Sequence, residues 1–139
     1  MRWVAGKVLG LMILAAAASP TPAHADSPPG PPIIFFDWDS IKIEPEAAVI
    51  LDGAVASFGR TVATGMVIQG ATDRSGSDAY NRGLSLRRAE VVRDYLVSRG
   101  VPVKAVGVQA NGEARPLVET EDGVKEAQNR YALVSYTVE

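Results

Sequence analysis

Apolar residues recur with two different periods along this chain of 139 residues, and the two periods predict different elements. A continuous apolar run or a near-alternating pattern is typical of strands, whereas apolar residues three and four positions apart are typical of helices. The expected strands lie at 33–36, within 62–69, at 103–109 and at 131–138. The expected helices lie at 44–59 and 78–98, with a short helical turn at 124–128.

The order of these elements predicts the class of fold. Strands that alternate with helices form crossover units, in which helices cover one sheet. We therefore expect an α/β (α+β) two-layer sandwich, ordered β-α-β-α-β-short helix-β, with a mixed four-stranded sheet.

The first 25 residues resemble a secretory signal peptide. A basic start is followed by an apolar run at 8–18 and then by Ala23-His24-Ala25, which suits a cleavage site. The apolar run is shorter than the about 20 residues that span a bilayer. We expect cleavage after Ala25, a Pro-rich spacer at 26–32 and one domain at 33–139, with no transmembrane segment in the mature chain.

The charge balance disfavours two classes of partner. The chain has 14 basic and 16 acidic residues, so its net charge is −2. Removal of the signal segment takes away Arg2 and Lys7 and no acidic residue, which moves the net charge to −4. A mildly acidic domain is a poor ligand for nucleic acid and for an anionic membrane surface.

The absence of two residue types narrows the chemistry further. The chain has no cysteine, so neither a disulfide nor a lipid-modified cysteine is expected. The only histidine, His24, lies in the segment that we expect to be removed. Without His or Cys, the usual nucleophilic triads and zinc sites cannot be built. We expect no enzyme activity, no cofactor and no metal.

The stretch from Thr72 to Leu96 holds the best candidates for a site. An Asp73–Gly76 turn leads into the second expected helix, on which Asn81, Ser85 and Arg88 share one face. The Asp73 carboxylate and the Arg88 guanidinium together suit a ligand that carries an ammonium and a carboxylate. The alternative is structural: Asp73 caps the turn and pairs with Arg88 or Arg74.

Several motifs, in this order and spacing, resemble the OmpA-like, peptidoglycan-associating domains over residues 33–139. The helix carries the family's spacing through Asn81, Leu84, Ser85, Arg88, Ala89, Val92 and Leu96. The other motifs are Phe36-Asp37-Trp38-Asp39, Gly70-Ala71-Thr72-Asp73, Gly112-Glu113-x-Arg115-Pro116 and Asn129-Arg130.

The resemblance implies non-covalent binding of cell-wall peptidoglycan through diaminopimelate, in the periplasm of a Gram-negative bacterium. On the family's pattern, Asp73 and Arg88 would grip the ammonium and the carboxylate of the ligand. Further hydrogen bonds would come from Thr72, Asn81, Asp39 and Arg130. The chain departs from the family at Ala71, where His is usual, and at Tyr131, where a second Arg is usual.

Two other functions stay open at this point. A periplasmic interaction module of an envelope complex could keep the fold without binding the wall, with envelope proteins as partners. A wall hydrolase could use Asp37 and Asp39 as an acid pair, perhaps with Asp73, but no second motif completes such a site.

Overall fold

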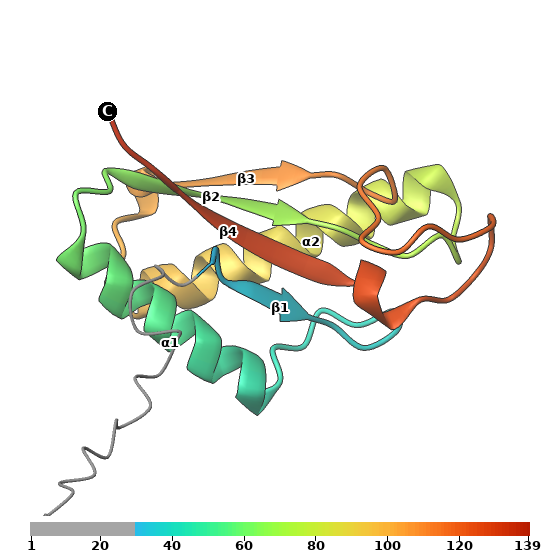
Figure 1. Ribbon diagram of the computed structural model, residues 1–139, viewed down its shortest axis with the longest axis horizontal. Helices are drawn as coiled ribbons and strands as arrows, with labels where there is room; N and C mark the ends of the chain where they lie inside the picture. The colour runs from blue at the N-terminus through green and yellow to red at the C-terminus, as the bar shows by residue number, and fades with distance from the viewer. Residues whose placement is uncertain (1–29) are drawn as a thin grey trace, which may run out of the picture.

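The computed structural model describes residues 30–139, which form one four-stranded sheet and two long helices (Figure 1). The expected signal segment at 1–25 and residues 26–29 of the spacer lie outside the described residues. The strands are β1 (Ile33–Phe35), β2 (Gly65–Gly70), β3 (Val106–Ala110) and β4 (Tyr131–Thr137). The helices are α1 (Pro45–Arg60) and α2 (Asp78–Ser98), with single 3₁₀ turns η1 (Val103–Ala105) and η2 (Ala127–Asn129).

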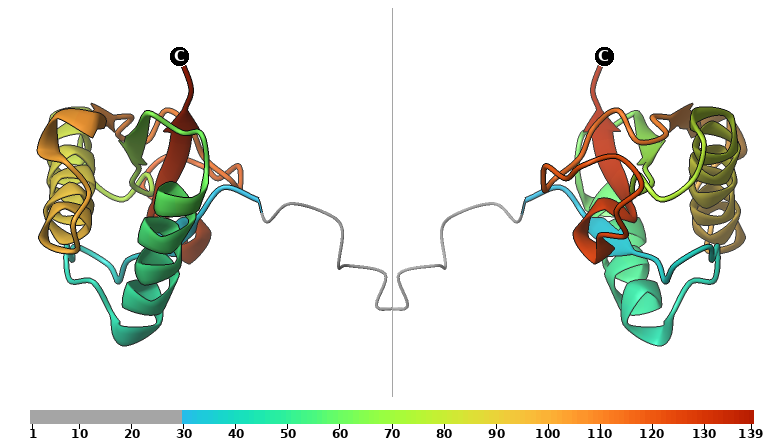
Figure 2. Two further views of the ribbon diagram at one scale, coloured as in Figure 1. Left: turned by 90° about the vertical axis from the view of Figure 1, so that its left-hand side faces the viewer. Right: turned by 90° about the vertical axis from the view of Figure 1, so that its right-hand side faces the viewer.

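The sheet is mixed, as expected. Its strand order is β1-β4-β2-β3, in which β4 runs antiparallel to both of its neighbours and β2 runs parallel to β3. In Figure 1 α2 runs behind the strands, and the end views of Figure 2 show the sheet beside α2, with α1 below it. The predicted two-layer α/β sandwich is confirmed.

The core lies between the inner face of the sheet and the two helices. Side chains of alternate strand residues meet those of the helices, and burial of this apolar surface is the main force that holds the layers together. The most deeply buried are Ile34, Met66, Ile68 and Val134 of the sheet, with Leu51 of α1 and Val92 and Leu96 of α2.

Two expected elements begin three residues later than predicted. The strand expected at 103–109 begins only at Val106, because 103–105 form a 3₁₀ turn after Pro102, whose carbonyl accepts a hydrogen bond from the Ala105 N–H. The strand expected within 62–69 is present as β2, and Val62 lies before it in the exposed connection from α1. The short turn lies at 127–129 rather than at 124–128. The side chain of Glu126, the residue before this turn, caps it.

The topology brings three chain segments to one end of the sheet. The segment after β1, the segment after β2 and the segment before β4 are neighbours there, because Phe35 pairs with Tyr131 and Gly70 with Ala132. The first turn of α2 follows directly, with Ser77 as its N-cap. Within residues 30–139, no helix combines the length and the apolar character that crossing a membrane requires.

Candidate ligand-binding site

Close contact between β2 and α2 sets the position of the site. Gly70 ends β2, and a Cβ at this position would lie 1.9 Å from the Ser85 carbonyl oxygen of α2. Only a glycine allows the helix to approach this far. The Ser85 hydroxyl donates to the Arg82 carbonyl and accepts from the Gly112 N–H, so it ties the loop after β3 to the same turn of helix.

Arg88 joins the loops at the centre of the site. Its guanidinium donates to the carbonyl oxygens of Ser40 (3.0 Å), Ala71 (3.0 Å) and Asp37 (3.1 Å), which belong to two different loops. The side chain is fully buried and lies over the Phe36 ring. Burial lowers its pKa to about 10, so Arg88 is cationic at neutral pH. A guanidinium has five N–H groups, so two remain beyond these three bonds.

Asp73 pairs with Arg130, not with Arg88 or Arg74. Its Oδ2 lies 3.2 Å from Nη1 of Arg130 and accepts the Glu126 N–H, while Oδ1 accepts the N–H and the hydroxyl of Ser75. The turn-capping role considered for Asp73 is therefore present, but with a different cation as its partner. Arg130 is held in place by a further bond from its Nε to the Phe36 carbonyl.

The environment of Asp73 favours its ionised form. Burial raises the pKa of this carboxyl, but the hydrogen bonds from Ser75, Glu126 and Arg130 lower it by more, so the net pKa lies below the ordinary value. Asp73 is thus a fixed anion between two fixed cations, Arg88 and Arg130.

A small cavity of about 50 Å³ opens beside these three side chains. Its lining includes all three, together with Asn81, Leu84, Asp39 and Tyr80. Trp38 lies at its edge and donates from Nε1 to the Ser75 hydroxyl at 3.1 Å. The Tyr80 hydroxyl donates to Asp39 across the mouth, and this bond raises the pKa of Tyr80.

Two cationic and two anionic side chains line the cavity. Arg88 and Arg130 are positive, whereas Asp73 and Asp39 are negative, and all four line one space. Such a set has no net charge, so it suits a ligand that is itself a zwitterion. Simple anions or cations would leave one pair of protein charges uncompensated.

The other expected site residues differ in their placement. Asn81 is buried and lines the cavity, and its side-chain Nδ2 lies within hydrogen-bonding distance of the Asp73 and Gly76 carbonyls and of Glu113. Thr72 is also buried, but it does not line the cavity, and its hydroxyl has no hydrogen-bond partner among the described residues. Ser85, which the pattern placed on the same helix face, is used in holding the loop.

Sequence reasoning missed Tyr80 and Ser75 as parts of the site. Tyr80 precedes Asn81 in the first turn of α2, and nothing in its local pattern indicates a contact with Asp39, 41 residues away. The two departures from the family pattern do not line the cavity. Ala71 contributes its carbonyl to Arg88, and the Tyr131 hydroxyl donates to the Arg115 carbonyl at 2.7 Å.

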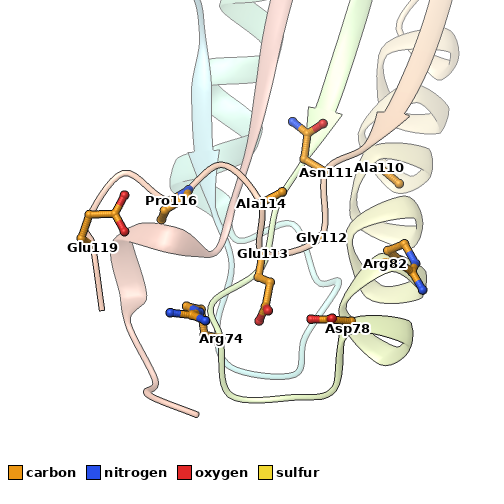
Figure 3. A pocket seen from close by; sticks show the side chains of 10 residues that line it. All are labelled: Arg74, Asp78, Arg82, Ala110, Asn111, Gly112, Glu113, Ala114, Pro116 and Glu119. Carbon is orange, nitrogen blue, oxygen red and sulfur yellow. The ribbon is translucent and has the colours of Figure 1, made fainter. Parts of the chain in front are cut away.

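A larger hollow of about 520 Å³ lies on the other side of the 73–78 turn (Figure 3). Glu113 and Asp78 point toward one another there, and the hydrogen bond between their carboxyls raises the pKa of Glu113. Arg74 and Arg82 also line this hollow. Asn81 connects the two spaces, because it lines the small cavity and bonds Glu113. No group of three or more potential metal ligands occurs between residues 30 and 139.

Comparison with known proteins places the chain in a family. The sequence model described as the OmpA family matches residues 35–130. The peptidoglycan-associated lipoprotein of Pasteurella multocida is 37 % identical over 103 residues, which are 74 % of this chain and 69 % of that protein. Outer membrane protein A of Escherichia coli O157:H7 is 38 % identical over 104 residues, 73 % of this chain but only 29 % of that protein.

Solved structures agree on the fold. The peptidoglycan-associated lipoprotein from Burkholderia pseudomallei superposes with a TM-score of 0.65 at 30 % identity, covering 76 % of this chain and 89 % of that chain. The C-terminal domain of Helicobacter pylori MotB gives a TM-score of 0.66 at 15 % identity, covering 78 % of this chain and 86 % of that chain, which shows the fold alone. With these matches beside the geometry above, the chain belongs to the OmpA family.

Proposed function

We propose that this protein binds peptidoglycan non-covalently by holding the zwitterionic end of diaminopimelate at the small cavity. The observation that carries the proposal is the charge-balanced set that lines the cavity, in which Asp73 and Arg88 are buried, Arg130 is half-buried and Asp39 is exposed. In this arrangement the ligand ammonium lies against the Asp73 carboxylate. The ligand carboxylate accepts from Arg130 and from the two N–H groups that Arg88 does not use on backbone carbonyls.

The remaining residues act around that ion pair. The Asn81 amide fixes the turn that presents Asp73, and it also faces the ligand space. Asp39 offers a second carboxylate to the ammonium once Tyr80 releases it. Thr72 adjoins Asp73 in the chain, and its buried hydroxyl has no hydrogen-bond partner among residues 30–139, so we assign it a hydrogen bond that forms only once the ligand has entered and the surrounding loop has moved.

Entry of the ligand requires the mouth to open. A space of about 50 Å³ holds only a few water molecules. An amino-acid head group therefore enters when the Trp38–Ser75 and Tyr80–Asp39 bonds break and the loop that carries Trp38 moves aside. These lost bonds offset part of the binding energy, so a single site should bind with a dissociation constant on the order of micromolar to millimolar. Many stem peptides on one wall then give durable attachment.

The names of the relatives support this function and a place in the cell envelope. They include peptidoglycan-associated lipoproteins and outer membrane proteins, so we assign this chain to the periplasm of a Gram-negative cell. A binding role fits the site better than a catalytic one. The candidate acid Asp39 is occupied by Tyr80, and Asp37 is exposed to solvent outside the cavity.

The decisive experiment compares two walls that differ by one carboxylate. Peptidoglycan with diaminopimelate should pellet the protein, whereas peptidoglycan with lysine at the same stem position should leave it in solution. Free diaminopimelate should release the pelleted protein, and free lysine should not. Equal pelleting with both walls would overturn the proposal.

Variants test the residues separately from the fold. Asp73→Asn and Arg130→Gln should each weaken pelleting at least tenfold, because a side chain that pairs with the ligand loses its charge. The matched controls are Asp94→Asn and Arg87→Gln on the exposed side of α2, which should pellet as the wild type does. Circular dichroism of every variant separates lost binding from lost folding.

A further inference from the structure

The outer face of α1 carries apolar side chains that no other described segment covers. Val49 is 71 % exposed and Ile50 is 43 % exposed, although the opposite face of the same helix packs Leu51 and Ala54 into the core. A helix that is apolar on both faces is typical of one that is buried on both sides. Within residues 30–139, only one side of α1 is buried.

Gly53 lies at the centre of this exposed face, and the fold of the chain does not require it. A Cβ at this position would meet no atom within 4 Å. Glycine inside a helix is less stable than alanine, so an unneeded helix glycine calls for another reason. A residue without a side chain lets a second helix approach closely, because interaxial distance depends on the side chains at the contact.

The charges on this face are arranged symmetrically about Gly53. Glu46 lies seven residues before it and Arg60 seven residues after it, and seven residues are about two helical turns. Both side chains are exposed, and neither forms a salt bridge within the described part of the chain. Ile50 and Ala56, both apolar and exposed, lie three residues to either side of Gly53.

We infer that α1 pairs with α1 of a second copy of this chain. Two antiparallel helices that cross at Gly53 about a two-fold axis bring Glu46 of each copy beside Arg60 of the other. One self-complementary face thus forms two ion pairs around an apolar centre of Val49, Ile50 and Ala56. A helix-to-helix contact of this length is a small interface, so the dimer is a weak one.

A membrane surface fits this face less well. Helices that lie on membranes carry several basic residues on their polar side and meet anionic lipid. In α1 the only basic residue is Arg60, and Glu46 and Asp52 are acidic. Symmetric opposite charges favour a second copy over lipid. This inference does not depend on the proposed wall binding.

Charge exchange across the two-fold axis provides the test, with sedimentation velocity of the full protein over about 0.01 to 1 mM as the measurement. Wild type should shift from monomer to dimer with concentration. Glu46→Arg and Arg60→Glu should each weaken dimerisation at least tenfold, because each brings like charges together. The double variant should recover the wild-type dimer. An equimolar mixture of the two single variants should form a heterodimer, because positions 46 and 60 are then both positive in one copy and both negative in the other.

A change in the stability of α1 itself cannot explain the expected pattern of results. Both exchanges oppose the helix dipole, and the double variant carries both penalties, so its recovery cannot come from a more stable helix. Circular dichroism confirms that each variant is folded. A wild type that stays monomeric over the whole range would overturn the inference, as would single variants that dimerise like the wild type. Flotation of monomeric wild type with vesicles of phosphatidylethanolamine and phosphatidylglycerol would overturn it in favour of lipid.

Discussion

The two helices depart from the usual amphipathic pattern in opposite directions. α2 buries polar side chains on its core face, where Asn81, Ser85 and Arg88 are almost inaccessible. α1 exposes apolar side chains on its outer face, where Val49 and Ile50 lie. Burial of polar groups is unfavourable unless they are hydrogen-bonded, and the three on α2 all make hydrogen bonds to loop backbone. The buried polar side chains of α2 therefore hold together the loops of the candidate site, whereas the apolar face of α1 points to a contact outside the molecule.

Replacement of Arg88 should have the largest effect on stability, because Arg88 is the residue of α2 that joins the loops after β1 and β2. Arg88→Met leaves the carbonyls of Ser40, Ala71 and Asp37 without their shared donor. We expect the free energy of unfolding to fall by about 4 kcal/mol, measured by urea denaturation. Arg87→Met changes the exposed neighbour and should cost less than about 0.5 kcal/mol. Equal small losses in both variants would show that Arg88 does not hold the loops.

A methyl group between β2 and α2 should have the next largest effect. Gly70→Ala places a Cβ against the Ser85 carbonyl of α2, which must then move away. We expect a loss of about 3 kcal/mol in the free energy of unfolding. Gly107→Ala in β3 is the matched control, since its nearest atom lies at 3.8 Å and its stability should change little. A tolerated Gly70→Ala would contradict the close approach on which the site depends.

Acid should lower the stability of the protein by protonating Asp73, which holds the loops beside α2. Because the folded state lowers the pKa of this carboxyl, it contributes stability above its unfolded pKa near 3.9, and that contribution is lost as the pH falls through the lower folded value. Asp73→Asn should lose about 2 kcal/mol at pH 7 and show a smaller further loss below about pH 4 than wild type does. Urea midpoints from pH 7 to pH 2.5 measure both, with the exposed Asp94→Asn as control. Parallel pH curves for wild type and Asp73→Asn would contradict the lowered pKa.

The buried polar face of α2 was largely predictable from local periodicity. The spacing of Asn81, Ser85 and Arg88 placed them on one face, and the structure buries all three. The strand and helix order also followed from local patterns, because the two helices are long enough to show their period and the strands contain short apolar runs. The start of β3 did not, because the apolar residues at 103–105 fit a 3₁₀ turn as well as a strand once Pro102 precedes them.

The partners of the site residues could not be predicted in the same way. The pairing of Asp73 with Arg130 joins residues 57 apart, and the bond from Arg88 to Asp37 joins residues 51 apart. Such contacts depend on how three loops meet at one end of the sheet, and no local pattern encodes that geometry. Tyr80 escaped notice for the same reason, since its partner Asp39 belongs to a different loop.

The smallest expected effect is that of Gly53→Ala in α1. This change should raise the stability of the monomer but weaken self-association. Gly53→Ala adds a Cβ in open space inside a helix, so it should stabilise the monomer by about 0.5 to 1 kcal/mol in urea denaturation at low protein concentration. The same methyl group keeps two helices apart, so self-association should weaken a few-fold. Gly100→Ala is the contrasting glycine: its φ of +108° disfavours a side chain, and the monomer should lose stability. If Gly53→Ala instead destabilised the monomer, the glycine would serve the fold of the single chain, and its position would no longer argue for a second helix.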